Sequence, residues 1–140
     1  MVDKEKIRQK IDFIHQELKK LKQLKNLTDE EFKQGPFYFD AALRILQVAI
    51  EAMIDICNHI VAREGLGIPQ NYRDGFKILA DQQILEPEML DTYIKMTKFR
   101  NRIVHIYDEV KKEEVYRIIQ TNLPDFERFV ASIVKSYFHN

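Results

Sequence analysis

Apolar residues recur along most of the chain at helical spacing, and no segment shows the alternation typical of a strand. Between residues 3 and 25 the apolar positions follow one another at intervals of three and four. They are Ile7, Ile11, Ile14, Leu18, Leu21 and Leu24. Such intervals place side chains on one face of a helix. The pattern therefore predicts a first long helix over residues 3–25.

A second, wider apolar face lies between residues 37 and 63. Its members are Leu43, Leu46, Ile50, Met53, Ile54, Cys57, Ile60 and Val61. This face is broader than the stripe that packing against a single neighbour requires. We therefore expect a second long helix that packs on two sides, and one of these sides is a candidate dimer interface. Gly65 is the residue expected just after this helix ends.

Polar and turn residues predict two short helical segments. Thr28 and Glu31 have the spacing of a capping box, which predicts a single helical turn that ends before Pro36. Further along, Asp74 is the expected N-cap of a short helix near residues 74–83.

Two more long helices complete the predicted fold. One covers about residues 87–105, with Pro87 in its first turn. The last begins near Lys111, and Pro124 must kink or restart it. The chain has only 4 glycines and 4 prolines, so few breaks separate the helices. We expect an all-α single domain over residues 1–140, an up-and-down bundle of four main helices plus a short one.

Composition indicates a soluble globular protein. The 140 residues are 45% hydrophobic and 31% charged, which is not the balance of a disordered chain. We expect no membrane span and no signal peptide, because no long uninterrupted apolar segment occurs. Cys57 is the only cysteine, so no intrachain disulfide can form. A cytoplasmic location is therefore expected.

The charge distribution argues against a strongly basic nucleic-acid clamp, because the formal net charge is zero. Residues 1–26 nevertheless hold eight Lys or Arg and four Asp or Glu, a net charge of +4. A second basic cluster consists of Lys95, Lys98, Arg100 and Arg102. Both clusters have an ordinary interpretation as solvated helix faces, but the second surrounds the motif described next.

Candidate chemistry lies in the stretch from Phe99 to Asp108, where Arg100 is followed by His105 and Tyr107. The RNA 2′-hydroxyl can attack its own adjacent phosphate if a base, an acid and a cation assist. Histidine serves as acid or base near neutral pH, and arginine binds phosphate oxygens with its fork of N–H groups. This pair therefore suits metal-free RNA cleavage, and we predict neither a metal nor an organic cofactor.

The spacing of Arg100 and His105 restricts how they can cooperate. Five residues of unbroken helix separate two side chains by about 140° and by about 7.5 Å along the axis. Either the helix unwinds before His105, or two chains combine their residues across a two-fold axis. Asp55 and His59 lie four residues apart and are a possible half-site for a metal, but no further ligands with suitable spacing accompany them.

The motif resembles the R-x4-H-x-Y signature of the HepT-like toxins in the HEPN superfamily. Arg100, Asn101, His105 and Tyr107 match it completely. Residues 44–60 resemble the second helix of the family, and residues 67–72 resemble its connecting segment. The resemblance covers roughly residues 5–135.

This resemblance implies a homodimeric endoribonuclease toxin, with Arg100 and His105 of both chains meeting in one cleft. Cellular RNA is the implied substrate, with tRNA favoured. Asn101 and Arg102 are candidates for RNA-binding or supporting contacts. The implied partner is an MNT-type nucleotidyltransferase antitoxin, which silences such toxins by adding AMP to the tyrosine of the motif, here Tyr107. An anionic group beside a phosphate-binding site would repel RNA.

Two other hypotheses compete with this one. The chain could be a non-catalytic HEPN module that binds nucleotides or a nucleotidyltransferase, or it could be a purely structural dimerisation bundle. The structural hypothesis predicts that replacing Arg100 lowers stability. The enzyme hypothesis predicts that the same replacement abolishes toxicity while the melting temperature stays near normal.

Overall fold

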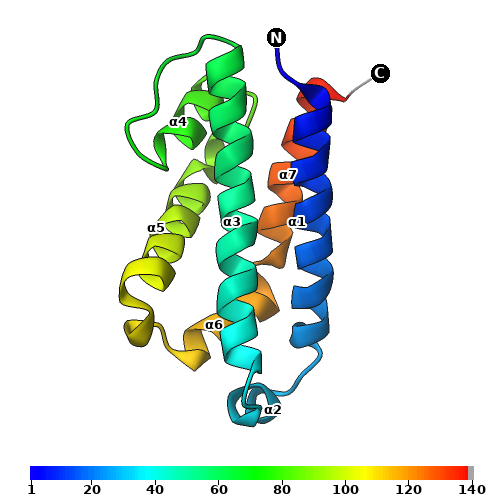
Figure 1. Ribbon diagram of the computed structural model, residues 1–140, viewed down its shortest axis with the longest axis vertical. Coiled ribbons are helices and arrows are strands. Elements are labelled where there is room, and N and C mark those ends of the chain that lie inside the picture. Colours follow the sequence, from blue (N-terminus) through cyan, green and yellow to red (C-terminus); the bar gives the residue numbers. More distant parts are fainter. Residues whose placement is uncertain (139–140) are drawn as a thin grey trace.

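The computed structural model describes residues 1–138, and all regular structure within this range is helical (Figure 1). Two 3-10 turns, η1 (Pro87–Met89) and η2 (Tyr107–Glu109), flank the fifth α-helix. The α-helices are α1 (Lys4–Lys25), α2 (Asp29–Gln34), α3 (Tyr38–Arg63), α4 (Asp74–Asp81), α5 (Leu90–Ile106), α6 (Lys112–Thr121) and α7 (Leu123–Tyr137). The predicted all-α bundle is thus confirmed.

Helix α3 is the central element of the bundle. In Figure 1, α1 and α7 lie on one side of it, and α4 and α5 lie on the other. Twelve residues of α3 are buried, among them all eight of the predicted apolar face. By length and composition α3 could cross a membrane, which the sequence analysis did not expect of any segment. However, 56% of its apolar window is buried inside the bundle, as in the core helix of a soluble protein.

Three aromatic rings connect α4 and α5, on one side of α3, to α7. Phe76 of α4, Tyr93 of α5 and Phe129 of α7 are fully buried, and their ring centroids lie 5.5 to 5.9 Å apart. Such separations suit stacked and edge-on aromatic pairs. Burial raises the pKa of the Tyr93 hydroxyl well above its usual value. This cluster fixes the position of α5, which carries the motif.

The structure corrects the prediction for the start of α4. Asp74 is not the N-cap, because the N-cap position belongs to Arg73, which makes no side-chain capping bond. Asp74 instead lies in the first turn and accepts the backbone N–H of Gln70 at 2.8 Å. The Asn71 side chain takes over part of the capping, since its Oδ1 accepts the N–H groups of Arg73 and Asp74 at 3.0 and 3.1 Å.

Two prolines lie at the start of helical segments. The sequence analysis expected this of Pro87 and left open whether Pro124 kinks or restarts the last helix. Pro87 opens η1, and α5 itself begins only at Leu90. Pro124 restarts the last helix instead of kinking it, so α6 ends at Thr121 and α7 begins at Leu123. A proline lacks the N–H that a continuous helix requires, but it is tolerated in a first turn.

The predicted capping box at α2 is confirmed. The Thr28 hydroxyl accepts the N–H of Glu31 at 3.1 Å, and the Glu31 carboxylate accepts the N–H of Thr28 at 2.8 Å. Phe32 follows in α2 and is fully buried beneath the ring of Tyr116. The box therefore holds a core aromatic residue in place against α3 and α6.

We predict that Thr28→Ala lowers the free energy of unfolding by about 1 kcal/mol, because it removes a helix N-cap. Thr28→Ser keeps the hydroxyl and is the matched control. Chemical denaturation of both variants at neutral pH provides the measurement. Equal stabilities of the two variants would contradict a role for the capping hydroxyl.

Candidate functional site

The motif lies on the C-terminal half of α5 and on the turn that follows. Helix α5 continues without a break through His105 to Ile106, and Tyr107 is the first residue of η2. The alternative in which the helix unwinds before His105 is therefore wrong. Within one chain, Arg100 and His105 stay about 140° apart around the helix axis.

Arg100 turns toward the central helix and meets a carboxylate there. Its Nε and Nη2 atoms donate to Oε2 of Glu51 at 2.9 and 2.7 Å. Its third bond runs from Nη1 to Oδ1 of Asn101 at 3.1 Å. The guanidinium also lies 4.7 Å from the ring centre of Tyr72, within cation–π range. With 12% of its side chain exposed, Arg100 is held on three sides at the edge of the bundle.

Glu51 is a site residue that the sequence analysis did not identify. Partial burial would raise its pKa, but the hydrogen bonds from Arg100 and Gln47 outweigh burial and hold the pKa of this carboxyl below its usual range. Gln47 donates to the same Oε2 atom at 3.1 Å, one helical turn away. The available signal was a charged residue inside the otherwise apolar run 48–54, since charged side chains are seldom buried without a partner.

The ion pair also corrects the prediction about Arg100 that was meant to distinguish the enzyme hypothesis from the structural-bundle hypothesis. Arg100 is paired and mostly buried, so its replacement leaves the Glu51 carboxylate without its partner. Loss of one member of a buried pair is destabilising. A near-normal melting temperature is therefore not expected for an Arg100 variant under either hypothesis. His105 is the better residue for that comparison.

His105 and its neighbours are exposed. His105 lies in the last turn of α5 and makes no side-chain hydrogen bond within residues 1–138. Val104 and Ile106 on either side are 38% and 40% exposed, and Tyr107 is 66% exposed. This stretch thus presents one imidazole and one phenol hydroxyl on a surface with apolar side chains.

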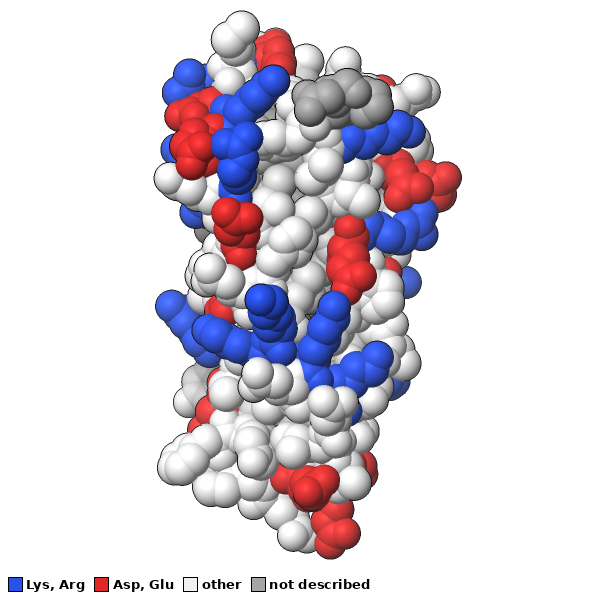
Figure 2. All heavy atoms as spheres, turned by 90° about the vertical axis from the view of Figure 1, so that its right-hand side faces the viewer, with Lys and Arg blue, Asp and Glu red and all other residues white. Residues whose placement is uncertain are grey.

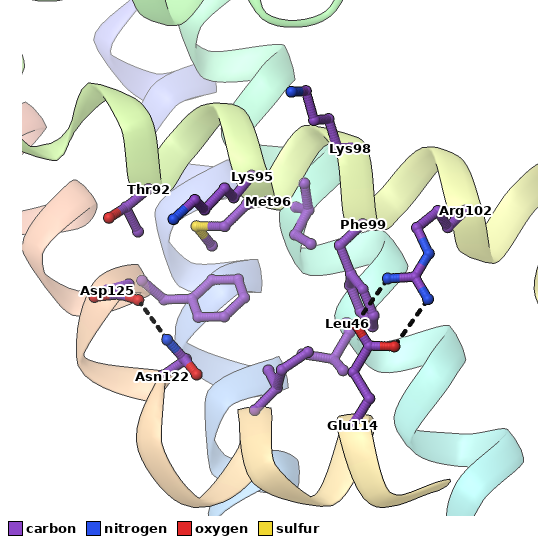
Figure 3. A pocket seen from close by; sticks show the side chains of 13 residues that line it. Leu46, Thr92, Lys95, Met96, Lys98, Phe99, Arg102, Glu114, Asn122 and Asp125 are labelled. Atoms are coloured by element: carbon purple, nitrogen blue, oxygen red, sulfur yellow. Dashed lines mark hydrogen bonds and ion pairs between the residues drawn. The ribbon is translucent and has the colours of Figure 1, made fainter. Parts of the chain in front are cut away.

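Arg102 has a different environment from Arg100. Its Nη1 and Nη2 atoms donate to the two carboxylate oxygens of Glu114 on α6 at 2.7 and 2.9 Å (Figure 3). This pair lies at the edge of a pocket of about 550 Å³ between α3, α5, α6 and α7. Lys95 and Lys98 line the same pocket. The predicted basic cluster is therefore divided, because Arg100 points to the other side of α5.

Asn101 contacts Arg100 and lines a second pocket, of about 430 Å³. The other lining residues are Asn58 of α3 and Pro69, Gln70, Asn71 and Tyr72 of the α3–α4 connection. The structure thus brings Asn101 next to the catalytic candidate Arg100, and it places Arg102 in a separate ion pair.

The remaining charged candidates lie apart from the motif. The basic helix α1 is on the opposite side of α3 from α5 (Figure 1). Figure 2 shows that Lys and Arg form a band across this face, with acidic residues above and below the band. Asp55 pairs with Lys10 at 3.0 Å, and His59 accepts the N–H of Asp3 at 3.0 Å, so both possible metal ligands have other partners. Within residues 1–138 no group of three or more potential metal ligands occurs.

Comparisons with known proteins identify relatives across most of the chain. Residues 14–133 match the family described as Ribonuclease HepT-like. The mRNA nuclease HepT of Shewanella oneidensis is 40% identical over 103 residues, which are 74% of this chain and 77% of that protein. The tRNA nuclease HepT of Aphanizomenon flos-aquae is 28% identical over 130 residues, 91% and 86% of the two chains.

A solved structure shares the fold. It is the tri-AMPylated Shewanella oneidensis HEPN toxin in complex with an MNT antitoxin, and its toxin has 37% sequence identity and a TM-score of 0.85 to this chain. The match covers 95% of this chain and 98% of that one. The fold described above is therefore that of a HEPN toxin.

We predict that Glu51→Gln lowers the free energy of unfolding at neutral pH by roughly 1–3 kcal/mol, because a hydrogen-bonded charge partner of Arg100 is lost. The folded-state pKa of Glu51 lies below its ordinary value of 4.5. Its stabilising effect is therefore fully present above that value and is lost as the pH falls through the folded pKa.

The measurement is urea denaturation of wild type and variant between pH 7 and acid pH. The difference in free energy of unfolding between wild type and Glu51→Gln should shrink as the pH falls below about 4.5. Glu88→Gln is the control, because Glu88 is exposed and makes no side-chain hydrogen bond in the described part of the chain. A difference that does not depend on pH would contradict the ion pair.

Proposed function

Because this chain belongs to the HepT-like ribonuclease family, we propose that it is the toxin of a toxin–antitoxin pair and an endoribonuclease that cleaves cellular RNA in the cytoplasm. The observation that carries this proposal is the complete motif on α5 and the turn that follows it, with Arg100 held in place by Glu51 and with His105 exposed. The preference for tRNA stays a prediction, since the two named relatives act on mRNA and on tRNA respectively.

In the proposed reaction the RNA 2′-hydroxyl attacks the adjacent phosphorus. A base removes the hydroxyl proton, the bond from phosphorus to the 5′ oxygen breaks, and an acid protonates that oxygen. The products are a 2′,3′-cyclic phosphate and a 5′-hydroxyl. Imidazole can supply both proton transfers, and a guanidinium stabilises the charge on the phosphorane. Neither role requires a metal.

Arg100 is prepared for a phosphate by its neighbours. Three of its N–H groups are engaged, two by Glu51 and one by Asn101. The remaining N–H groups can donate to phosphate oxygens without breaking these bonds. Glu51 is therefore a positioning residue, which fixes the guanidinium before the substrate arrives.

The active site of this proposal belongs to a homodimer. One chain separates Arg100 from His105 around α5, so a second chain must bring its own histidine close to the first guanidinium. The exposed apolar side chains beside His105 support an interface at this end of α5, because contiguous apolar surface marks association sites. Two histidines meeting there could divide the roles of base and acid.

The proposed antitoxin is an MNT-type nucleotidyltransferase that modifies Tyr107. Two observations support this. The related toxin of known structure is AMPylated and bound to an MNT antitoxin, and the Tyr107 side chain is 66% exposed in a short turn two residues after His105. AMP attached there would place negative charge beside the phosphate site.

We predict that His105→Ala lowers the cleavage rate of total cellular RNA by about 100-fold or more, the contribution of a positioned acid or base. The melting temperature should change little, because the side chain is exposed. His15→Ala, which changes an exposed histidine on α1, is the matched control and should retain activity. Equal absence of cleavage by wild type and His105→Ala would favour the non-catalytic binding module.

We predict that the nucleotidyltransferase encoded beside this gene, incubated with this chain and ATP, adds whole AMP units to Tyr107. Intact-protein mass spectrometry and peptide mapping provide the measurement. Tyr107→Phe should stay unmodified and should keep cleaving RNA in the presence of the antitoxin. An adduct on another residue, or none on the wild type, would remove the regulatory claim while leaving the nuclease claim intact.

A further inference from the structure

The pocket beside Arg100 has no role in the chemistry proposed above. It forms where the connection from α3 to α4 passes over α5, and its volume is about 430 Å³. This lies in the range of small-molecule binding pockets. Its lining residues are Asn58, Pro69, Gln70, Asn71, Tyr72 and Asn101, and we call it the amide pocket.

The lining of the amide pocket carries hydrogen-bonding groups but no charge. Four of its six residues are carboxamides, one is an aromatic ring, and none is acidic or basic. The larger pocket, in contrast, contains lysines, an arginine and two carboxylates. Carboxamides pair with the edges of nucleobases, and an aromatic ring stacks on their faces. The composition therefore suits a neutral planar ligand better than a phosphate or a cation.

Existing hydrogen bonds fix which groups the pocket offers. Oδ1 of Asn101 accepts from Arg100, and Oδ1 of Asn71 accepts two backbone N–H groups at the start of α4. Both residues therefore have their amide nitrogens left as donors. A ligand that presents carbonyl oxygens or ring nitrogens would accept from them.

Asn58 lines the same pocket and has one unsatisfied atom, which lies against Gly75 of α4. Its Oδ1 atom is buried and has no hydrogen-bond partner among the described residues. A buried polar atom without a partner is unfavourable, and such atoms are uncommon in native proteins. Rotation of the carboxamide exchanges oxygen and nitrogen, so Asn58 can present either group to a ligand.

Tyr72 joins the amide pocket to the proposed phosphate site. The Arg100 guanidinium lies 4.7 Å from the centre of the Tyr72 ring. The same residue lines the pocket and is 46% exposed. A phosphate on Arg100 and a base in the amide pocket would therefore be neighbours, as they are within one nucleotide.

We propose that the amide pocket binds one base of the RNA substrate, that of a nucleotide next to the phosphate held by Arg100. This inference rests on the proposed ribonuclease function and adds a base-reading subsite to it. Asn58, Gln70, Asn71 and Asn101 contact the edge of the base, and Tyr72 contacts its face. Arg100 remains the phosphate ligand, and the amide pocket has no part in bond cleavage.

The test measures base-dependent binding without requiring cleavage. Full-length protein carrying His105→Ala is titrated with an RNA oligonucleotide, and with copies in which a single abasic ribonucleotide replaces each position in turn. One abasic position should weaken binding about tenfold, the scale of one stacked and hydrogen-bonded base. Adding Gln70→Ala should reduce this abasic effect, because it removes one of the proposed contacts with the base. The fold should tolerate the change, since the Gln70 side chain makes only one long contact, 3.5 Å to the Ile68 carbonyl.

Asn71→Asp is the second variant. Aspartate keeps an oxygen to cap α4 but replaces the donor that faces the pocket with an acceptor. Its added charge repels intact and abasic RNA alike, so the affinity ratio between the two reports on the base alone. Gln16→Ala, an exposed glutamine on α1, is the control and should leave this ratio unchanged.

The outcomes separate this inference from the function on which it rests. An abasic effect at one position that falls in both pocket variants supports the subsite. If no abasic position weakens binding, or if the weakening is equal in all variants, the base subsite is overturned even when the wild type cleaves RNA. The pocket would then be left to another ligand, such as a peptide of the antitoxin. Base-dependent binding without cleavage by the wild type would keep the subsite and reject the nuclease. Wild type that neither binds nor cleaves RNA overturns both.

Discussion

One carboxylate oxygen on the central helix determines the geometry of the whole site. Oε2 of Glu51 accepts from Nε and Nη2 of Arg100 and from Gln47. Because the arginine is 12% exposed, the pair forms where water screens little and where charge-assisted bonds are strong. The same arrangement directs Nη1 toward Asn101 and places the guanidinium against Tyr72. Helices α3 and α5 and the loop that follows α3 are thus connected through one side chain.

The central helix combines two roles that are usually separate. Its apolar face contributes twelve buried residues to the core, while Gln47 and Glu51 form a polar ridge one helical turn apart. A reactive arginine placed on a loop would lose its orientation with every loop movement. Here the arginine and its carboxylate both belong to long helices, and the aromatic cluster of Phe76, Tyr93 and Phe129 holds the helix of the arginine. Stability and site geometry therefore depend on the same packing.

Local patterns were sufficient for the helices but not for the site. Spacing predicted α1 and α3 to within a residue or two, and the Thr28 box was found because its signal lies within four residues. Asp74 was misassigned because the Asn71 side chain, three residues earlier, accepts the N–H groups at the helix start, while the Asp74 carboxylate accepts the N–H of Gln70. Glu51 was missed because its partner lies 49 residues away, and pairing across that distance leaves no trace in a local window. The position of Arg102 against Glu114 was missed for the same reason.

The turn after α5 makes the Tyr107 side chain accessible without any opening of the fold. Tyr107 lies in a three-residue 3-10 turn in which no residue is buried, and the core resumes only at Val110. A substituent on that phenol would extend into water and would displace no packed side chain. Attachment would therefore proceed on the intact fold, without the slow opening events that buried acceptors demand.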